Sequence, residues 1–147
     1  VFDFDGVFTD NRVYVDENGK ESVCCSRSDG LAIDILRHFS VINDWHPKLF
    51  ILSKEKNSVV ASRAAKLKID CINSVDNKLV AIDAYLTGQS LSRHGLVYLG
   101  NDLNDMPVMK LDDIYSVAPQ DAHPKILEIA DDAFRALGSP SSKAITG

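Results

Sequence analysis

Short apolar runs alternate with helical patterns along most of this 147-residue chain. Residues 49–52 form a continuous apolar run that is typical of a fully buried strand, and residues 57–67 place Val60, Ala64 and Leu67 on one side of a helix. Strands that alternate with helices form a parallel sheet with helices on both of its faces. The sequence therefore predicts an α/β fold, a Rossmann-like parallel sheet in three layers.

A β-hairpin is expected near the N-terminus. Asn18-Gly19 stands between two runs of alternating residues, which is a strong signal for a tight turn, so we expect a hairpin flap over about residues 12–25. Residues 1–137 are predicted to form one domain, and the Ser-, Gly- and Pro-rich residues 138–147 a flexible tail. A helix is expected after the hairpin, with a buried face made of Ala32, Ile35, Leu36 and Phe39.

Composition and charge exclude several classes of protein. The net charge of -5 and the absence of a Lys/Arg block argue against a nucleic-acid surface. No apolar run approaches the roughly 20 residues that cross a bilayer, so no membrane partner is expected. Cys24, Cys25 and Cys71 lack the spacing of a zinc site and are expected to be reduced thiols of a cytoplasmic protein. Because Val1 opens directly on a strand, we expect residues before it, and an upstream domain is an open alternative.

Two carboxylates stand where the first predicted strand, residues 2–4, ends. Asp3 and Asp5 are two residues apart, so their side chains would point to the same side of a strand. Placing two carboxylates this close is energetically unfavourable unless a cation lies between them or they have different catalytic roles. Gly6 permits a sharp turn beside them. Since ligands of parallel α/β sheets bind beyond the carboxyl ends of the strands, this edge is the candidate site.

Other polar residues follow the remaining strands and suit a phosphate monoester. Asp3 would attack phosphorus, and Asp5 would protonate the leaving alkoxide. Mg²⁺ would bridge Asp3, the Asp5 carbonyl and Asp102, while Ser53 and Lys78 would bind phosphoryl oxygens. Each residue alone also has an ordinary structural explanation, such as a turn, an N-cap or a solvated lysine. Their joint occurrence at strand ends favours the phosphatase interpretation.

These residues also carry a resemblance. The chain resembles the haloacid dehalogenase (HAD) superfamily of phosphotransferases through four motifs: Asp3-Phe4-Asp5-Gly6, Ser53, Lys78 and Gly100-Asn101-Asp102-x-x-Asp105. The resemblance implies that Asp3 is the nucleophile and Asp5 the general acid and base. It implies that Asp3, Asp5 and Asp102 bind Mg²⁺. Asn101 and Asp105 would not bind the ion themselves but would hold its ligands in place.

The segment between the first two motifs indicates which branch of the superfamily the chain resembles. It holds only the predicted hairpin and one helix, which is similar to the capless branch of 3-deoxy-octulosonate 8-phosphate and nonulosonate 9-phosphate phosphatases. Members of that branch are typically homotetramers in which the hairpin and a neighbour's residues close the active site. Arg27 and Asp29 also fit the branch and are expected to bind substrate. The stretch 138–145 departs from the branch because it lacks the usual glycine run and arginine.

Three residues bear on the substrate. Glu55, Arg63 and Lys66 resemble the nine-carbon sugar phosphatases, although a surface salt-bridge cluster would explain them too. The leading prediction is a magnesium-dependent phosphatase of a sialic-acid-like nonulosonate 9-phosphate, acting through an aspartyl-phosphate intermediate. The first alternative is an octulosonate 8-phosphate phosphatase. The second is a non-catalytic oligomerisation domain of an acylneuraminate cytidylyltransferase, whose appended domain resembles this chain and whose synthetase domain would lie upstream.

Overall fold

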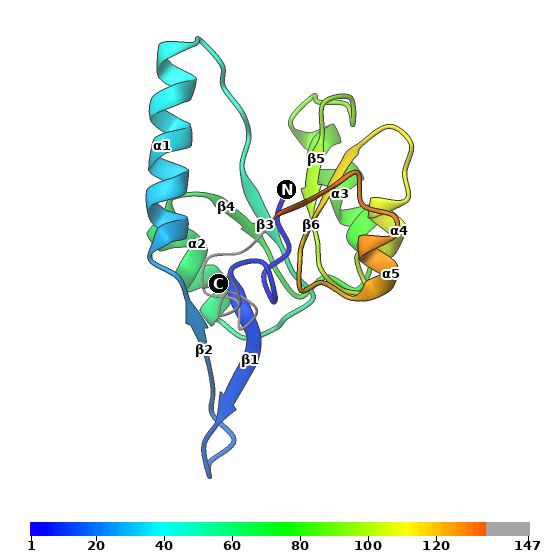
Figure 1. Ribbon diagram of the computed structural model, residues 1–147. Coiled ribbons are helices and arrows are strands. Elements are labelled where there is room, and N and C mark those ends of the chain that lie inside the picture. Colours follow the sequence, from blue (N-terminus) through cyan, green and yellow to red (C-terminus); the bar gives the residue numbers. More distant parts are fainter. Residues whose placement is uncertain (135–147) are drawn as a thin grey trace, which may run out of the picture.

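The computed structural model describes residues 1–134 of the chain (Figure 1). The predicted tail at 138–147 and the last three residues of the predicted domain lie outside the described residues. The elements are β1 (Thr9–Val15), β2 (Glu21–Cys25), α1 (Ser28–Ile42), β3 (Phe50–Leu52), α2 (Val59–Leu67), β4 (Asp70–Ile72), α3 (Lys78–Gly88), β5 (Val97–Leu99), α4 (Met106–Met109), β6 (Tyr115–Pro119), α5 (Pro124–Leu127) and β7 (Asp132–Phe134).

The central sheet is parallel, as the alternation of strands and helices predicted. β3 pairs with β4, and β6 lies between β5 and β7. Phe2 joins the two halves because it forms parallel bridges with Ile51 of β3 and Leu99 of β5. The predicted first strand is therefore in place, but it is shorter than residues 2–4. The chain leaves the sheet after Asp3, whose N–H donates to the Leu99 carbonyl at 2.8 Å, and turns over residues 4–8.

Helices cover the sheet on two sides, and the core is divided accordingly. Successive residues of β3 alternate between the sides. Phe50 and Leu52 pack with Ile82 of α3 and Ile126 of α5, whereas Ile51 packs with α2. The predicted inner face of α2 is confirmed, since Val60, Ala64 and Leu67 are all buried. Figure 1 shows α2 and the group of α3, α4 and α5 on opposite sides of the strands.

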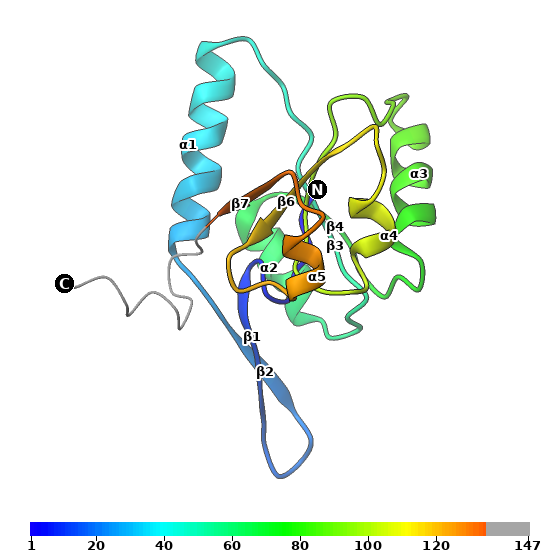
Figure 2. The ribbon, with the colours of Figure 1, turned by 45° about the vertical axis from the view of Figure 1, so that its right-hand side comes forward.

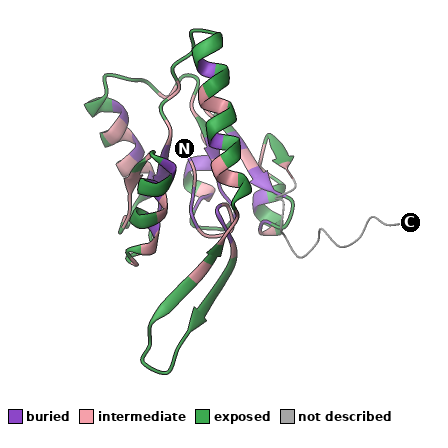
Figure 3. Ribbon diagram, turned by 90° about the vertical axis from the view of Figure 1, so that its left-hand side faces the viewer, coloured by how far each residue is buried: buried purple, intermediate pink, exposed green. Residues whose placement is uncertain are grey.

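The predicted buried face of α1 is wrong. Only Ile33 and Ser40 of this helix are buried, while Ile35 and Phe39 are 59% and 54% exposed. α1 stands at the edge of the domain, and most of its length is exposed (Figure 3). Its Arg37 guanidinium ties it to the end of α2 by donating to the carbonyls of residues 67 and 68. The helical period was predicted correctly, but the sequence does not say which face has a neighbour within the chain.

The predicted hairpin is present and extends away from the sheet (Figure 1 and Figure 2). β1 and β2 pair antiparallel with a register shift between Thr9 and Val13, and Asn11 within that shift has a φ of 59°. Only this hairpin and α1 lie between the N-terminal turn and β3, so the described part of the chain has no cap domain. None of the helices within residues 1–134 is long and apolar enough to cross a membrane.

Candidate active site

The ends of several chain segments meet in one cavity at the edge of the sheet. The cavity has a volume of about 210 Å³. The N-terminal turn, the segment after β3 and the segment after β5 all contribute to it. It is lined by Asp3, Asp5, Asn11, Ser53, Lys54, Glu55, Asn101, Asp102 and Asn104. Lys78 reaches the same place from the first residue of α3.

The N-terminal turn brings Asp3 and Asp5 to the cavity in a different way from the strand that we predicted. Asp3 follows the bridge at the sheet, and Asp5 already lies in the turn. Gly6 has a φ of +78°, and a Cβ at this position would lie 1.9 Å from Nδ2 of Asn101. Only glycine permits this conformation and this close approach without strain. Phe4 anchors the turn because its ring is completely buried.

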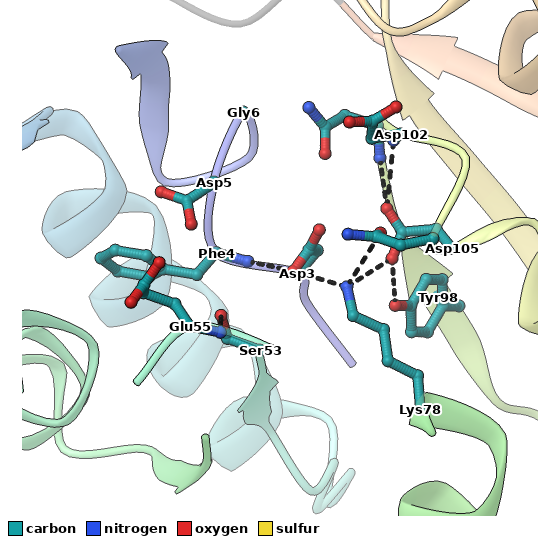
Figure 4. Close-up of polar contacts among 12 residues, drawn as sticks. Asp3, Phe4, Asp5, Gly6, Ser53, Glu55, Lys78, Tyr98, Asp102 and Asp105 are labelled. Atoms are coloured by element: carbon teal, nitrogen blue, oxygen red, sulfur yellow. Dashed lines mark hydrogen bonds and ion pairs between the residues drawn. The ribbon is translucent and has the colours of Figure 1, made fainter. Parts of the chain in front are cut away.

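A buried ion-pair network holds Asp3 in place. Lys78 Nζ lies 2.7 Å from Asp3 Oδ1 and 2.6 Å from Asp105 Oδ1 (Figure 4). All three residues are buried, so each charge depends on the others for compensation. The Asn77 side chain caps α3 by accepting from the Val80 N–H at 3.2 Å, and this cap fixes the turn from which Lys78 extends.

Asp105 is the centre of this network. Its Oδ1 accepts from Lys78 and from the Tyr98 hydroxyl at 2.6 Å, and its Oδ2 accepts from the backbone N–H groups of Asn101 and Asp102 at 2.9 and 3.1 Å. Sequence reasoning missed Tyr98, because an aromatic residue inside a short apolar strand is normally read as core. Burial, together with the charges of Asp105 and Asp3, raises the pKa of Tyr98 well above its usual value, so it remains a donor.

The two carboxylates of the first motif have different surroundings. Burial and the charge of Asp105 raise the pKa of Asp3 to about 7, although Lys78 and the Phe4 N–H act in the opposite direction. Asp3 Oδ1 accepts from Lys78 and from the Phe4 N–H at 2.8 Å, whereas Oδ2 has no hydrogen bond within the described residues. Burial and the neighbouring Glu55 also raise the pKa of Asp5. Two carboxylates with raised pKa values beside a cavity are a setting that a bound cation would stabilise.

The oxygen atoms of the cavity fit a magnesium ion. The Asn101 Oδ1 atom is buried and has no hydrogen-bond partner in the structure. Asp3, Asp5 and Asp102 border the same space. No group of three or more His, Cys, Asp or Glu side chains suited to a metal occurs within residues 1–134. The set predicted from the sequence instead combines the side chains of Asp3 and Asp102 with the Asp5 backbone carbonyl. Magnesium commonly uses one or two carboxylates and completes its shell with water.

Ser53 offers a hydrogen-bond donor to the cavity. Its Oγ accepts from the Glu55 N–H at 3.0 Å, which leaves the hydroxyl hydrogen free to donate into the cavity. Glu55 also borders a second cavity of about 260 Å³ under the hairpin, and Asp5 and Asn11 line both cavities. The two cavities therefore adjoin each other beside Asp5, Asn11 and Glu55. The remaining residues around the second cavity are Arg12, Val13, Glu21, Val23, Asn57 and Val59.

The other predicted substrate residues lie elsewhere in this chain. Arg63 is paired with Asp29 at 3.4 Å and donates to the Ser26 carbonyl, so it joins α2 to the start of α1. Arg27 precedes the first residue of α1, and Lys66 is exposed in the last turn of α2. None of these four residues lines either of the two cavities. Within one chain the structure therefore brings Glu55, but not the other four, to the candidate site.

The parallel sheet thus carries an acidic turn, a serine, a lysine and a second acidic loop at its strand ends. No family model matches the chain. It is 32% identical over 139 residues to the 3-deoxy-D-manno-octulosonate 8-phosphate phosphatase KdsC of Escherichia coli K12, covering 94% of this chain and 70% of that protein. The chain therefore belongs to the KdsC-like phosphatases of the HAD superfamily, which are phosphoric monoester hydrolases.

Solved structures agree with this assignment. A HAD family hydrolase from Streptomyces avermitilis superposes with a TM-score of 0.80 at 38% identity, covering 90% of this chain and 72% of the other. The 3-deoxy-D-manno-octulosonate 8-phosphate phosphatase of Yersinia pestis superposes with a TM-score of 0.79 at 29% identity, covering 91% and 69%. The predicted superfamily and the predicted capless fold are thus confirmed.

Proposed function

We propose that this chain is a magnesium-dependent phosphatase that hydrolyses a sugar-acid phosphate through an aspartyl-phosphate intermediate. The observation that carries the proposal is the environment of Asp3. Lys78 and the Phe4 N–H hold Oδ1, and Oδ2 remains without a hydrogen bond on a side chain that lines the cavity. A carboxylate fixed at one oxygen and open at the other is arranged as a nucleophile.

The proposed reaction has two steps. Asp3 Oδ2 forms a bond to phosphorus while the bond from phosphorus to the sugar oxygen breaks, and that oxygen keeps the electron pair and takes a proton from Asp5. A water then attacks phosphorus and gives a proton to the Asp5 carboxylate. The bond from phosphorus to Asp3 breaks, which releases phosphate and restores the Asp3 carboxylate. Ser53 and Lys78 donate hydrogen bonds to the phosphoryl oxygens during both steps.

Magnesium would be held by Asp3, Asp102 and the backbone carbonyl of Asp5. When bound, it reduces the repulsion between an anionic nucleophile and an anionic ester. The residues of this chain supply the rest of the charge balance. The Lys78 ammonium already lies against Asp3, and Asp105 fixes its position.

Two sugar acids are candidates for the substrate. The names of the E. coli and Y. pestis relatives favour an eight-carbon 8-phosphate. Glu55 supports the nine-carbon 9-phosphate, because it lies between the phosphoryl cavity and the cavity under the hairpin, where it can accept hydrogen bonds from sugar hydroxyls. Turnover of both esters separates them. A marked preference for the eight-carbon ester would contradict the proposal that Glu55 selects the nine-carbon ester.

We also propose that the chain assembles as a homotetramer. Large apolar side chains are exposed on α1, on the segment after it and on the hairpin: Val13, Tyr14, Val15, Leu31, Ile35, Phe39, Val41, Ile42 and Trp45. Leu31, Ile35, Phe39 and Ile42 follow helical spacing along α1, and the Phe39 ring contacts Trp45. An exposed apolar helix face of this kind is typical of a contact between proteins. Arg27, Asp29, Arg63 and Lys66 would then act on substrate only from a neighbouring copy. Sedimentation equilibrium measures the mass in solution, and a monomer at micromolar concentration would contradict this part of the proposal.

The catalytic proposal is tested with Asp3→Asn. Phosphate release is followed on a panel of sugar phosphates, with magnesium and after treatment with EDTA. We expect wild-type activity to disappear with EDTA and to return with magnesium. The Asp3→Asn variant should be inactive and should still fold, as circular dichroism would show, because Lys78 keeps Asp105 as a charged partner and the amide keeps an acceptor oxygen. Activity that persists in this variant would remove Asp3 as the nucleophile. An inactive wild-type chain would favour the alternative of a non-catalytic domain fused to a cytidylyltransferase.

A further inference from the structure

The Thr9 hydroxyl takes part in three hydrogen bonds, and its role as donor or acceptor in each can be assigned. Thr9 is the first residue of β1 and is only 8% exposed. Its Oγ1 accepts from the N–H of Gly6 at 3.1 Å and from the N–H of Asn11 at 3.2 Å. A hydroxyl has two acceptor positions and one hydrogen. Because both acceptor positions are taken, the single hydrogen is left for Asp5 Oδ1, which lies 3.4 Å away.

Asp5 has no other hydrogen-bond donor in the described part of the chain. Asp105 accepts four hydrogen bonds, and Asp3 accepts two at one oxygen. Asp5 accepts only the one from Thr9. In Figure 4, Asp5 lies apart from the network around Lys78. The orientation of the Asp5 carboxylate therefore depends on this threonine.

Thr9 also belongs to the base of the hairpin. It pairs with Cys25 of β2, and the register shift that follows it includes Asn11 with its left-handed φ. A register shift takes backbone groups out of the ladder, and the Thr9 hydroxyl satisfies the N–H of Asn11. The same oxygen satisfies the N–H of Gly6 in the acidic turn. One side chain thus connects the hairpin, the turn and Asp5.

We infer that Thr9 is a positioning residue that orients Asp5 for proton transfer to the leaving oxygen. The inference rests on the proposed function. With Oδ1 held by the Thr9 hydroxyl, Oδ2 is the oxygen that carries the proton to the leaving alkoxide and later takes one from water. A separation of 3.4 Å is long for an O–H···O bond, and catalytic hydrogen bonds commonly tighten when substrate binds.

The test compares leaving groups in Thr9→Val and Thr9→Ser. Valine has the shape of threonine without the hydroxyl, and serine keeps the hydroxyl without the methyl group. The value of kcat/KM is measured on a sugar phosphate, whose alkoxide needs a proton to leave, and on 2,4-dinitrophenyl phosphate, whose phenolate does not. The value of kcat/KM reports on the steps from substrate binding up to departure of the leaving group. Thermal unfolding is measured for each variant, and Thr9→Ala is added because it leaves room for water to pair with the two freed N–H groups.

We expect Thr9→Val to lower kcat/KM about 10- to 100-fold on the sugar phosphate, a part of the usual effect of a general acid, and less than about 3-fold on the aryl phosphate. Thr9→Ser should restore the sugar phosphate reaction, and Thr9→Ala should behave as valine does. Equal losses on both esters would show a merely structural role and overturn the inference, as would unchanged sugar phosphate turnover. Asp5→Asn is measured alongside. If it lost both esters equally, the acid role in the proposed function would fail, whatever Thr9 does.

Discussion

Gly6→Ala tests the turn on which the whole site depends. Gly6 has a φ of +78°, and an added Cβ would lie 1.9 Å from Asn101 Nδ2 and 2.5 Å from Asn101 Cγ. Distances this short do not occur between such atoms, so either Asn101 or the acidic turn must move. Gly19→Ala is a matched control within the chain. Gly19 has a φ of +76°, and nothing lies within 4 Å of its added Cβ.

Gly6→Ala and Gly19→Ala share the cost of the left-handed backbone, and only Gly6→Ala has the additional cost of a steric clash. Alanine in the left-handed region costs about 1–2 kcal/mol at either position. Forcing extra atoms into a packed site adds about 1–3 kcal/mol, and this applies only to Gly6. We therefore expect Gly19→Ala to lower the free energy of unfolding by about 1–2 kcal/mol and Gly6→Ala by about 2–5 kcal/mol, the sum of the two costs.

Urea unfolding followed by circular dichroism gives both free energies, and phosphate release gives the activity. Displacing the turn moves Asp3 and Asp5 relative to Ser53 and Lys78, and a shift of about 1 Å in a catalytic group can cost about 100-fold in rate. Gly6→Ala should lose at least this much activity under conditions where it is folded, and Gly19→Ala should keep the wild-type rate. Equal destabilisation by the two variants, with activity retained in both, would refute the reasoning about this close approach.

Two further predictions concern single hydrogen bonds. Tyr98→Phe removes one donor to the buried Asp105 carboxylate and should lower the free energy of unfolding by about 1.5–3 kcal/mol. Tyr115→Phe is the control at a half-exposed tyrosine and should change the free energy of unfolding by less than about 0.5 kcal/mol. Equal effects of the two variants in urea unfolding would contradict the prediction. Asp131 accepts from the N–H and hydroxyl of Ser116, which lower its pKa from 3.8, so its stabilisation is present above pH 3.8 and is lost as the pH falls through the lowered pKa. The advantage of wild type over Asp131→Asn in unfolding midpoint should shrink as the pH falls below 3.8, and a constant difference would contradict the assignment.

The outcomes for α1 and α2 show what a hydrophobic period can and cannot predict. Both helices were expected from apolar spacing, and both are present. In α2 the residues of the predicted face, Val60, Ala64 and Leu67, are buried because β3 and β4 lie against that face. In α1 the predicted face, with Ile35 and Phe39, is exposed. A period identifies a face that would gain from burial, but it does not identify what covers that face.

The candidate site shows the same limit for polar residues. The rule that parallel strands end at one edge brought Asp3, Ser53 and Asp102 together correctly. Thr9 and Tyr98 were missed because each lies within a strand and has no local signal of function. Their importance comes from contacts with Asp5 and Asp105 that only the folded chain makes. Motif reasoning finds residues that line the cavity, and it overlooks the donors that contact them.

The roles that we propose for the two carboxylates rest on their environments rather than on their chemistry, which is the same. A nucleophile must keep one position through both steps, and Asp3 is buried and held by a cation and a backbone N–H at one oxygen. A general acid and base must serve a leaving alkoxide first and a water afterwards. Asp5 borders both the phosphoryl cavity and the cavity under the hairpin, with one hydroxyl as its partner. Exchanging the roles would require Asp5 to attack without Lys78 beside it, and Asp3 to reach a leaving group while Lys78 and the Phe4 N–H hold its Oδ1. The proposed difference in role therefore depends on where the turn at Gly6 places each side chain.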